Sequence, residues 1–391
     1  MKVLIVGAGI AGPTLAYWLL RAGHDVTLVE RAPELRRGGY LVDFWGAGFD
    51  VAERMGIVDE LRQRGYLFTE ARAVDRAGRR FASFEPSAMM GSTERYISIV
   101  RSDLSAVIYE ALGGAAELIL DDTVGSLADD GDRVRVRFES GTTRDFDLVV
   151  GADGLHSRVR RLAFGPDESY EKYLGMVFAA FEAVGYRPRD ELVAMMHAEV
   201  GFQALRLSLR DDLTLFLFSV RHDGPVPTAD RPAQEALLAT KLAGAGWETP
   251  AMLDLMPQAE AFYFDAVSQI RMPSWTRGRT ALVGDAGAGP SFLAGQGSAL
   301  AMVESYTLAA ELSRSTDHRE AFARYEARLA PFLRSKQNAA VGLGLAFAPR
   351  SRLQLLIRNT VLRLMGVPGV ADLAMGRSFH DAVELPDFVA A

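Results

Sequence analysis

Three glycines near the start of the chain have the spacing of a loop that wraps a pyrophosphate. Gly7, Gly9 and Gly12 form the pattern G-x-G-x-x-G. In this pattern the first glycine permits a tight turn, the second lets the backbone approach a pyrophosphate, and the third lets a helix pack closely on a strand. The start of the following helix would present free N–H groups to the anion. Glu30 follows at the distance where a carboxylate accepts hydrogen bonds from ribose hydroxyls. We therefore predict a dinucleotide site formed by Gly7, Gly9, Ile10, Ala11, Gly12 and Glu30.

Two later segments also place glycine and aspartate directly after an apolar run. Residues 147–150 precede a Gly-Ala-Asp-Gly sequence that contains Asp153, and residues 280–283 precede a Gly-Asp pair that contains Asp285. Ligands of a parallel sheet collect at the carboxyl ends of its strands, so we expect both aspartates near the first loop. Asp285 would offer a carboxylate to ligand hydroxyl groups. Backbone N–H groups at the start of a later helix would stabilise negative charge on the ligand, and the expected donors are Gly295, Gln296 and Gly297.

The elements that must position these residues follow from the hydrophobic pattern. Residues 3–6 and 26–30 are predicted to be strands with a helix at 13–22 between them, which makes a β-α-β unit. Between 167 and 271, runs of β-forming residues separated by turn signals predict a mainly antiparallel sheet. Its expected elements are strands at 193–196, 203–209 and 213–220 and a helix at 233–242. From residue 299 to the end we expect helices, with candidates at 301–312, 319–333 and 353–364.

The composition excludes several other chemistries. The 391 residues include no cysteine, which excludes disulfides, thiolate metal sites and a cysteine nucleophile. The formal net charge is −7, whereas a nucleic-acid binder or a polybasic membrane patch would need clustered positive charge. The six histidines show no paired metal-ligand spacing, so we expect no metal site. The longest apolar run, residues 339–348, is far short of a membrane span. We expect a cytoplasmic protein without nucleic-acid or membrane partners.

Three segments together resemble one enzyme family. Residues 151–160 (GADGLHSRVR) resemble the second fingerprint of the class A, single-component FAD-dependent aromatic hydroxylases, which include tetracycline-modifying monooxygenases. Gly-Asp-Ala at 284–286 with Gly-Gln-Gly at 295–297 resembles their third fingerprint, and residues 95–104 resemble the arginine-then-helix segment beside the flavin. The resemblance implies bound FAD, with Asp285 on the ribityl chain. The further cofactor contacts that we expect are Arg31, Arg37, Arg101, Val124 and Asp153, with Asp153 steering basic residues such as Arg37 near the pyrophosphate.

The resemblance also implies a fold and its domains. The expected class is α/β, a Rossmann-like FAD-binding domain of the aromatic-hydroxylase type with an inserted, mainly antiparallel substrate domain and C-terminal helices. The FAD-binding domain would comprise residues 1–65, 96–166 and 271–335. The substrate domain would comprise residues 66–95 and 167–270, and the C-terminal helical segment residues 336–391.

The reaction implied by the resemblance is a flavin-centred hydroxylation. NADPH or NADH would reduce the flavin, O2 would add at C4a, and the resulting hydroperoxide would hydroxylate an aromatic, phenolic or polycyclic molecule such as a polyketide or a tetracycline-like compound. We assign no side chain as catalyst, because the flavin itself is the reactive centre. The expected substrate contacts are His197, Arg206, Phe218 and Pro290, and Arg206 would favour a phenolate. We expect a monomer or a homodimer.

The third fingerprint departs from the family at two positions. Ala288 occupies the usual histidine position, and Ala299 occupies a position where asparagine is common. FAD binding should survive, but the coupling of flavin oxidation to hydroxylation is in doubt. One alternative is a flavin-dependent halogenase, although the tryptophans at 18, 45, 247 and 275 do not form its Trp-x-Trp-x-Ile-Pro segment. The other is a protein that holds FAD structurally while it binds or cyclises a substrate without redox chemistry.

Overall fold

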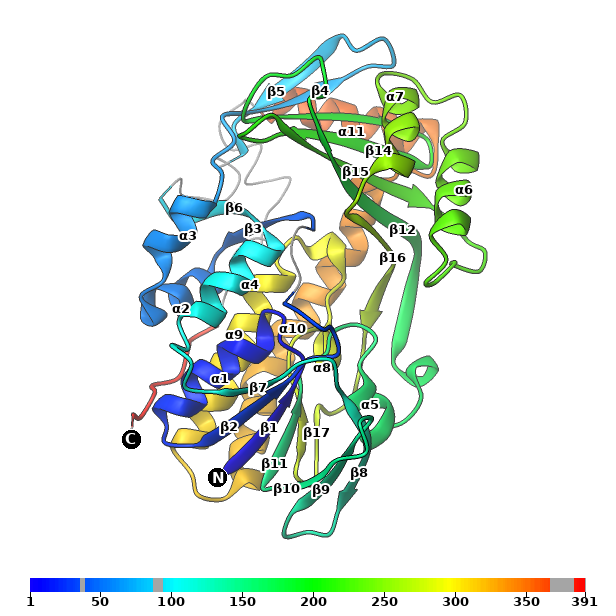
Figure 1. Cartoon of the computed structure of the whole chain (residues 1–391). Helices are drawn as coiled ribbons and strands as arrows, with labels where there is room; N and C mark the ends of the chain where they lie inside the picture. The colour runs from blue at the N-terminus through cyan, green and yellow to red at the C-terminus, as the bar shows by residue number, and fades with distance from the viewer. Residues whose placement is uncertain (36–38, 87–93, 366–382, 391) are drawn as a thin grey trace.

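A mainly parallel sheet forms the lower half of the molecule (Figure 1). The computed structural model describes residues 1–35, 39–86, 94–365 and 383–390. Within these ranges the six strands are ordered β17-β18-β11-β1-β2-β7, and only the β17–β18 pair is antiparallel. The strands are β1 Lys2–Val6, β2 Asp25–Val29, β7 Glu117–Ile119, β11 Leu148–Gly151, β17 Thr276–Arg277 and β18 Thr280–Leu282. The β1 strand is almost entirely apolar because both of its faces are covered.

Helices and a small antiparallel sheet surround this parallel sheet. Helices α1 (Ala11–Arg21) and α9 (Gly297–Ser313) pack on each other beside the strands, and α2 (Ala47–Met55) packs on α9. The remaining elements of this half are β3 Leu41–Trp45, α3 Val58–Arg64, β6 Tyr96–Val100, α4 Arg101–Glu110, β8 Val124–Asp129, β9 Val134–Phe138, β10 Thr143–Phe146, α5 Arg158–Ala163 and α8 Asp285–Ala288. The α/β fold predicted from the sequence is confirmed.

A second sheet, mainly antiparallel, forms the upper half. In the described part of the chain its seven strands are ordered β16-β12-β15-β14-β13-β4-β5. They are β4 Glu70–Val74, β5 Arg80–Phe84, β12 Glu171–Val184, β13 Val193–Glu199, β14 Phe202–Ser208, β15 Leu213–Arg221 and β16 Phe262–Ile270. One face packs against α6 (Arg231–Lys241) and α7 (Thr249–Leu255) through a core that includes Phe181 and Phe216. The long strands β12 and β16 run from the lower half into this sheet (Figure 1).

The C-terminal helices join the two halves. Helix α10 (His318–Phe347) is continuous, so the domain boundary expected between residues 335 and 336 falls inside one helix. Helix α11 (Arg352–Leu364) lies along the upper sheet beside β5. Residues 383–390 form no helix, contrary to the expectation of helices to the end of the chain; instead Phe388 packs on Trp18 and Pro386 accepts a hydrogen bond from Tyr306. None of the described helices is both long and apolar enough to cross a membrane.

Candidate functional site

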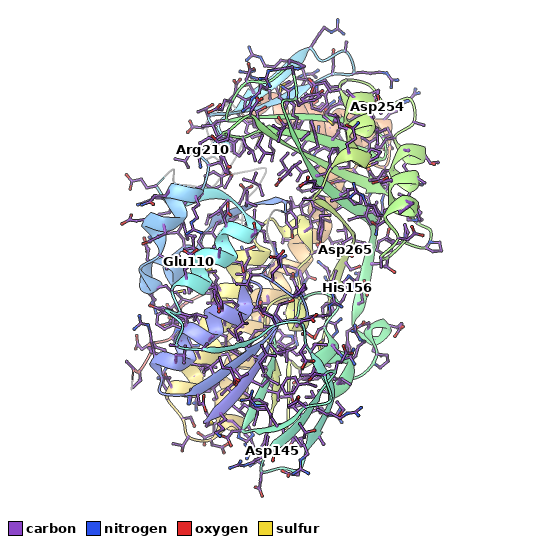
Figure 2. All side chains as sticks on the ribbon, in the orientation of Figure 1. Glu110, Asp145, His156, Arg210, Asp254 and Asp265 are labelled. Atoms are coloured by element: carbon purple, nitrogen blue, oxygen red, sulfur yellow. The ribbon has the colours of Figure 1, made fainter. Side chains whose placement is uncertain are left out.

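A cavity of about 1000 Å³ connects the carboxyl ends of the parallel strands with the inner face of the upper sheet. At one end it is bordered by the loop after β1 and by the end of β2, and at the other by α10, α11 and the upper sheet. His156 and Asp265 lie side by side on its wall between the two halves, with the His156 Nε2 atom 3.1 Å from Asp265 Oδ1 (Figure 2). The Asp265 carboxylate raises the pKa of His156. The cavity therefore has two parts: one beside the glycine loop, which we call the nucleotide end because the sequence predicts a dinucleotide there, and an upper chamber against the upper sheet.

The glycine loop has the geometry that its spacing predicts. Gly7 has a φ of +105°, and a Cβ there would lie 2.5 Å from the Ala152 carbonyl oxygen. A Cβ on Gly12 would lie 1.9 Å from the Gly7 carbonyl oxygen, so only glycine lets α1 approach β1. A Cβ on Gly9 would meet only the Arg101 guanidinium, at 3.9 Å, and Gly9 lines the cavity. These three positions fit a loop that approaches a pyrophosphate. Gly7, Gly9, Ile10 and Ala11 line the cavity, whereas Gly12 is buried behind them.

Glu30 lies directly after β2 on the cavity wall. Its carboxylate accepts hydrogen bonds from the N–H groups of Ala8, at 2.9 Å, and Ala32, at 3.0 Å. These bonds hold the side chain beside the glycine loop, and Arg31 also lines the cavity. The placement fits a carboxylate that accepts hydrogen bonds from a ribose.

The second motif is organised differently from our expectation. Asp153 lines the cavity, but its Oδ2 accepts hydrogen bonds from the N–H groups of Arg158, at 2.6 Å, and Val159, at 3.1 Å. Its Oδ1 accepts a hydrogen bond from the Ser157 hydroxyl. Asp153 therefore caps the start of α5, and Arg37, which it was expected to steer, lies outside the described residues. Val124 is fully buried in β8 and does not line the cavity, although its neighbour Thr123 does.

The third motif places a carboxylate and a helix start on the same cavity wall. Burial raises the pKa of Asp285, and the positive charge of Arg101 opposes that shift. Gly295 and Gly297 line the cavity, and a Cβ on either would meet no atom within 4 Å. Helix α9 begins at Gly297, and its N-cap residue Gln296, which is buried and not part of the lining, makes no side-chain cap. The free N–H groups of this first turn fit an anionic edge of a flavin, and Asp285 fits a polyol chain.

Both positions that depart from the family pattern are buried. A Cβ on Gly48 of α2 would lie 2.5 Å from the Cα of Ala299, so α2 packs closely on α9 at this position. Ala288 is buried, and its carbonyl accepts a hydrogen bond from Gln337 Nε2 at 3.2 Å. Pro290 is also buried outside the cavity lining, and its carbonyl accepts a hydrogen bond from Gln269 Nε2 at 3.0 Å.

Three of the residues expected to contact substrate lie on the wrong face of the upper sheet. His197 Nδ1 donates a hydrogen bond to the Val74 carbonyl at 3.1 Å, and its Nε2 lies 3.1 Å from Glu199 Oε1. Arg206 forms an ion pair with Glu248 at 2.6 Å. Phe218 packs in the core beneath α6 and α7. Side chains alternate between the two faces of a strand, so their immediate neighbours face the cavity instead. The cavity-facing residues of β13, β14 and β15 are Ala194, Met196, Gln203, Leu205, Leu207 and Leu217.

An aromatic cluster that the sequence did not reveal lies between the two chambers. Phe178 and Phe292 are stacked with centroids 3.8 Å apart, and the Tyr40 and Tyr263 rings are 4.9 Å apart. All four residues line the cavity. They come from an N-terminal loop, β12, β16 and the segment after α8, so no local pattern could have grouped them. Flat apolar surfaces of this kind suit a planar ring system.

Glu304 on α9 is a buried acid that contacts the backbone of the third motif at Gly284. It is 1% exposed, and its Oε2 accepts a hydrogen bond from the Gly284 N–H at 2.8 Å. Burial raises the pKa of Glu304 from 4.5 to about 8, and the negative charge of Asp285 adds to the shift. The side chain is therefore a neutral acid at pH 7, which avoids a second charge beside Asp285.

This raised pKa predicts how stability changes with pH. Between pH 4.5 and 8 the folded protein keeps a proton on Glu304 that the unfolded chain releases. The contribution of this group to stability is therefore fully present below pH 4.5, falls progressively as the pH rises, and is lost once the pH has passed 8. Glu304→Gln removes this titration while keeping the shape. We expect the wild type to lose at least about 1 kcal/mol more than the variant between pH 5 and pH 8, measured by urea denaturation of FAD-saturated protein. The exposed Glu320→Gln is the control; equal pH dependence in Glu304→Gln and wild type would contradict the assignment.

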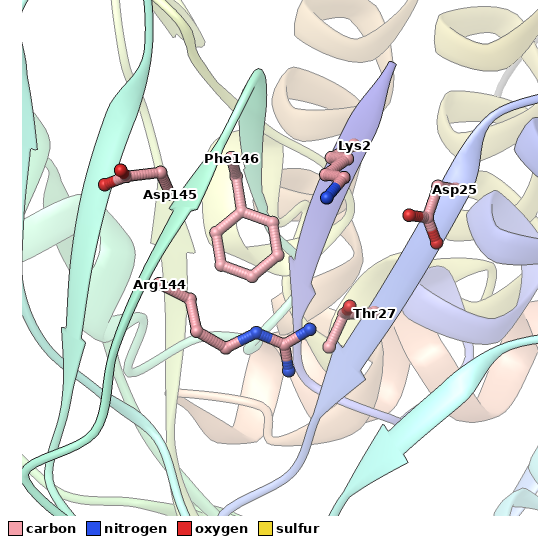
Figure 3. Close-up of a pocket in the computed structure, with 6 residues that line it drawn as sticks. All are labelled: Lys2, Asp25, Thr27, Arg144, Asp145 and Phe146. Carbon is pink, nitrogen blue, oxygen red and sulfur yellow. The ribbon is translucent and has the colours of Figure 1, made fainter.

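A second, smaller hollow of about 250 Å³ lies at the amino-terminal ends of β1 and β2 (Figure 3). It is lined by Lys2, Asp25, Thr27, Arg144, Asp145 and Phe146. The Glu117 carboxylate accepts hydrogen bonds from Arg144 at 2.8 Å and from the Thr27 hydroxyl at 2.8 Å. Asp145 accepts a hydrogen bond from Arg135 at 3.1 Å. Because these groups already have protein partners, we assign the functional site to the larger cavity.

Comparisons with known proteins agree with this geometry. Residues 1–336 match the family described as FAD binding domain. A flavin-dependent monooxygenase from an unknown prokaryotic organism is 37% identical over 394 residues, which cover 99% of this chain and 99% of that protein. An FAD-dependent monooxygenase of Sarocladium schorii is 30% identical, over 94% of this chain and 93% of its own. The crystal structure of tetracycline destructase Tet(55) is 34% identical, with a TM-score of 0.85, and the match covers 99% of this chain and 98% of that one.

Proposed function

The chain belongs to the FAD binding domain family and is an FAD-dependent monooxygenase of the class A aromatic-hydroxylase type, and from this we propose that it uses NAD(P)H and O2 to insert one oxygen atom into a polycyclic, phenolic or enolic molecule. In balance, NAD(P)H, a proton, O2 and the substrate give NAD(P)⁺, water and the oxygenated product. The observation that carries the proposal is the single cavity that joins the nucleotide loop to a chamber large enough for fused rings. Bound FAD would supply the electron transfer and oxygen activation.

The residues at the nucleotide end hold the cofactor in this proposal. The loop from Gly7 to Ala11 would approach the pyrophosphate, and Glu30 would accept hydrogen bonds from the adenosine ribose. Asp285 and Arg101 would contact the flavin half. The first turn of α9 would stabilise negative charge on the flavin ring, because its N–H groups are fixed in place before any charge develops.

The residues of the upper chamber position the substrate. The stacked pair Phe178 and Phe292, with Tyr40 and Tyr263, would orient a planar ring system at the junction with the flavin half. Leu205, Leu207 and Leu217 extend an apolar wall from there along the upper sheet, which would keep water from the reacting atoms. The similarity to tetracycline destructase Tet(55) supports a tetracycline-like or other polyketide-like ring system as the substrate class.

We test the proposal by measuring NADPH oxidation, peroxide and product in parallel. Tetracycline is the first probe, added to FAD-loaded protein under air. We expect substrate-stimulated NADPH oxidation and a product heavier by one oxygen atom, with little peroxide. If neither tetracycline nor a panel of hydroxylated polycycles stimulates NADPH or NADH oxidation, the proposal fails in favour of a structural FAD. A product that incorporates chloride or bromide instead of oxygen would favour a halogenase.

A further inference from the structure

The face of α11 that borders the cavity carries one charged side chain among the described residues. Five residues of this helix and its C-cap residue line the cavity at helical spacing: Gln354, Ile357, Arg358, Val361, Leu362 and Met365. Five of them are neutral, and Arg358 lies in the middle of this face. The surrounding walls from β13, β14 and β15 are mostly apolar as well. Arg358 therefore places a guanidinium within an apolar chamber.

Arg358 is held by neutral acceptors only. Its Nε donates to the Ala346 carbonyl at 2.7 Å, and its terminal nitrogens donate to Asn359 Oδ1, at 3.1 Å, and to Gln203 Oε1. Among the described residues no carboxylate forms an ion pair with Arg358, and no charged neighbour contributes to the shift of its pKa. By contrast, Arg206, on the opposite face of the same sheet, is paired with Glu248. Arg358 is half-buried. A partly desolvated guanidinium without a nearby carboxylate would be stabilised by an anion that enters the cavity.

The charge on Arg358 persists at neutral pH. Burial lowers the pKa of Arg358 to about 10, which leaves the side chain protonated at pH 7. Its hydrogen bonds to Ala346 and Asn359 fix the orientation of the planar guanidinium. A guanidinium in a fixed orientation can donate parallel N–H bonds to the two oxygens of a carboxylate. The interaction with Gln203 is the one that an anion in the cavity could replace, because Gln203 also lines the cavity.

We propose that Arg358 is the anion-binding residue of the substrate chamber, and that the substrate is a fused-ring molecule whose end away from the flavin carries an anionic oxygen, either a carboxylate or an ionised enol or phenol. This inference rests on the proposed function for the identity of the chamber. It moves the phenolate-binding role from Arg206, where we expected it, to an arginine that lines the cavity. Figure 1 shows α11 in the upper half, beside the upper sheet, whereas the loop after β1 lies at the carboxyl end of the lower sheet. Both segments line the cavity, so the anion would anchor the end of the ring system that is distant from this loop.

The test compares two probes of nearly the same shape, one with an anionic carboxylate and one with a neutral amide in its place. Anthracene-2-carboxylate and anthracene-2-carboxamide are titrated into FAD-loaded protein, and binding is followed by the change in flavin absorbance, without NADPH. The variants are Arg358→Gln, which removes the charge, Arg358→Lys, which keeps it, and Arg363→Gln, an exposed arginine on the same helix that serves as control. FAD content and thermal stability of each variant are measured first.

We expect the wild type and Arg363→Gln to bind the carboxylate at least about tenfold more tightly than the amide, because a desolvated charged pair is worth more than a neutral hydrogen bond. Arg358→Gln should bind both probes equally, with unchanged affinity for the amide, and Arg358→Lys should restore part of the preference. Equal affinity of the wild type for both probes, including failure to bind either, would overturn the proposal, as would a preference that survives in Arg358→Gln. Because these assays need no turnover, the NADPH assay above can fail or succeed independently.

Discussion

Replacing Gly12 by alanine is expected to give a protein that neither retains FAD nor keeps its thermal stability. The new Cβ would lie 1.9 Å from the Gly7 carbonyl oxygen and 3.4 Å from Ile5 Cγ2. The first contact is with backbone, so no side-chain rotation can relieve it, and α1 would have to move away from β1. Overpacking of a buried contact typically costs 1–3 kcal/mol, and a contact this short lies at or above about 3 kcal/mol. Because α1 also packs on α9, the displacement would reach the helix start at Gly297.

Gly9→Ala is the matched control for this prediction. A Cβ on Gly9 would meet only the flexible Arg101 side chain, at 3.9 Å, yet it would project toward the cavity where a pyrophosphate would lie. We expect Gly9→Ala to lose FAD affinity while its FAD-free form melts at the wild-type temperature, whereas Gly12→Ala melts lower even without FAD. Flavin absorbance after gel filtration and differential scanning calorimetry separate the two effects. A Gly12→Ala protein with wild-type FAD content and melting temperature would contradict our assignment of the loop.

Local sequence patterns were enough to expect that the glycine loop, Glu30 and Asp285 would lie together, and all of them border one cavity; their contacts with FAD stay a prediction. The roles of Gly7, Gly9 and Gly12 depend on turn geometry and on contacts between adjacent elements, and such contacts leave a signature at fixed spacing. Asp285 likewise follows its strand directly, so its position at the sheet edge is set by the topology. Asp153 shows where this reasoning ends. Its place on the cavity wall was predictable, but its carboxylate accepts hydrogen bonds from the N–H groups at the start of α5.

The substrate chamber was harder to predict, for two physical reasons. Alternation along β14 separates Arg206 from Gln203 and Leu205, but it does not tell which face the helices α6 and α7 will cover. Arg206 was chosen for its charge, and the structure uses that charge in a buried pair with Glu248. Arg358 is distant in sequence from every strand of the sheet that it faces. Only the path of α10 between the two halves brings α11 to the cavity, and no local pattern encodes that path.

Replacing Asp285 by asparagine is expected to weaken FAD binding by about ten- to a hundredfold, since a hydrogen bond to a charged group contributes roughly 1.5–3 kcal/mol. Asparagine keeps the size of the side chain and one acceptor oxygen, so the change isolates the charge. The charge matters for a second reason: Arg101 and Asp285 influence each other electrostatically inside the cavity wall, and the variant removes a negative charge from the surroundings of the arginine. The dissociation constant is measured by titrating FAD into FAD-free protein and following the quenching of flavin fluorescence.

Asp153→Asn separates a cofactor ligand from a carboxylate that is merely nearby. Both aspartates line the cavity, and burial raises the pKa of both. The Asp153 oxygens, however, already accept three hydrogen bonds from the start of α5, so losing that charge should lower the melting temperature of the FAD-free protein and affect FAD affinity less than Asp285→Asn does. If Asp153→Asn instead weakened FAD binding more than Asp285→Asn, the second motif and not the third would carry the direct contact. The hydroxyl groups of the cofactor chain would then lie nearer to α5 than to α8, and the direction in which we place FAD along the cavity would have to be reversed.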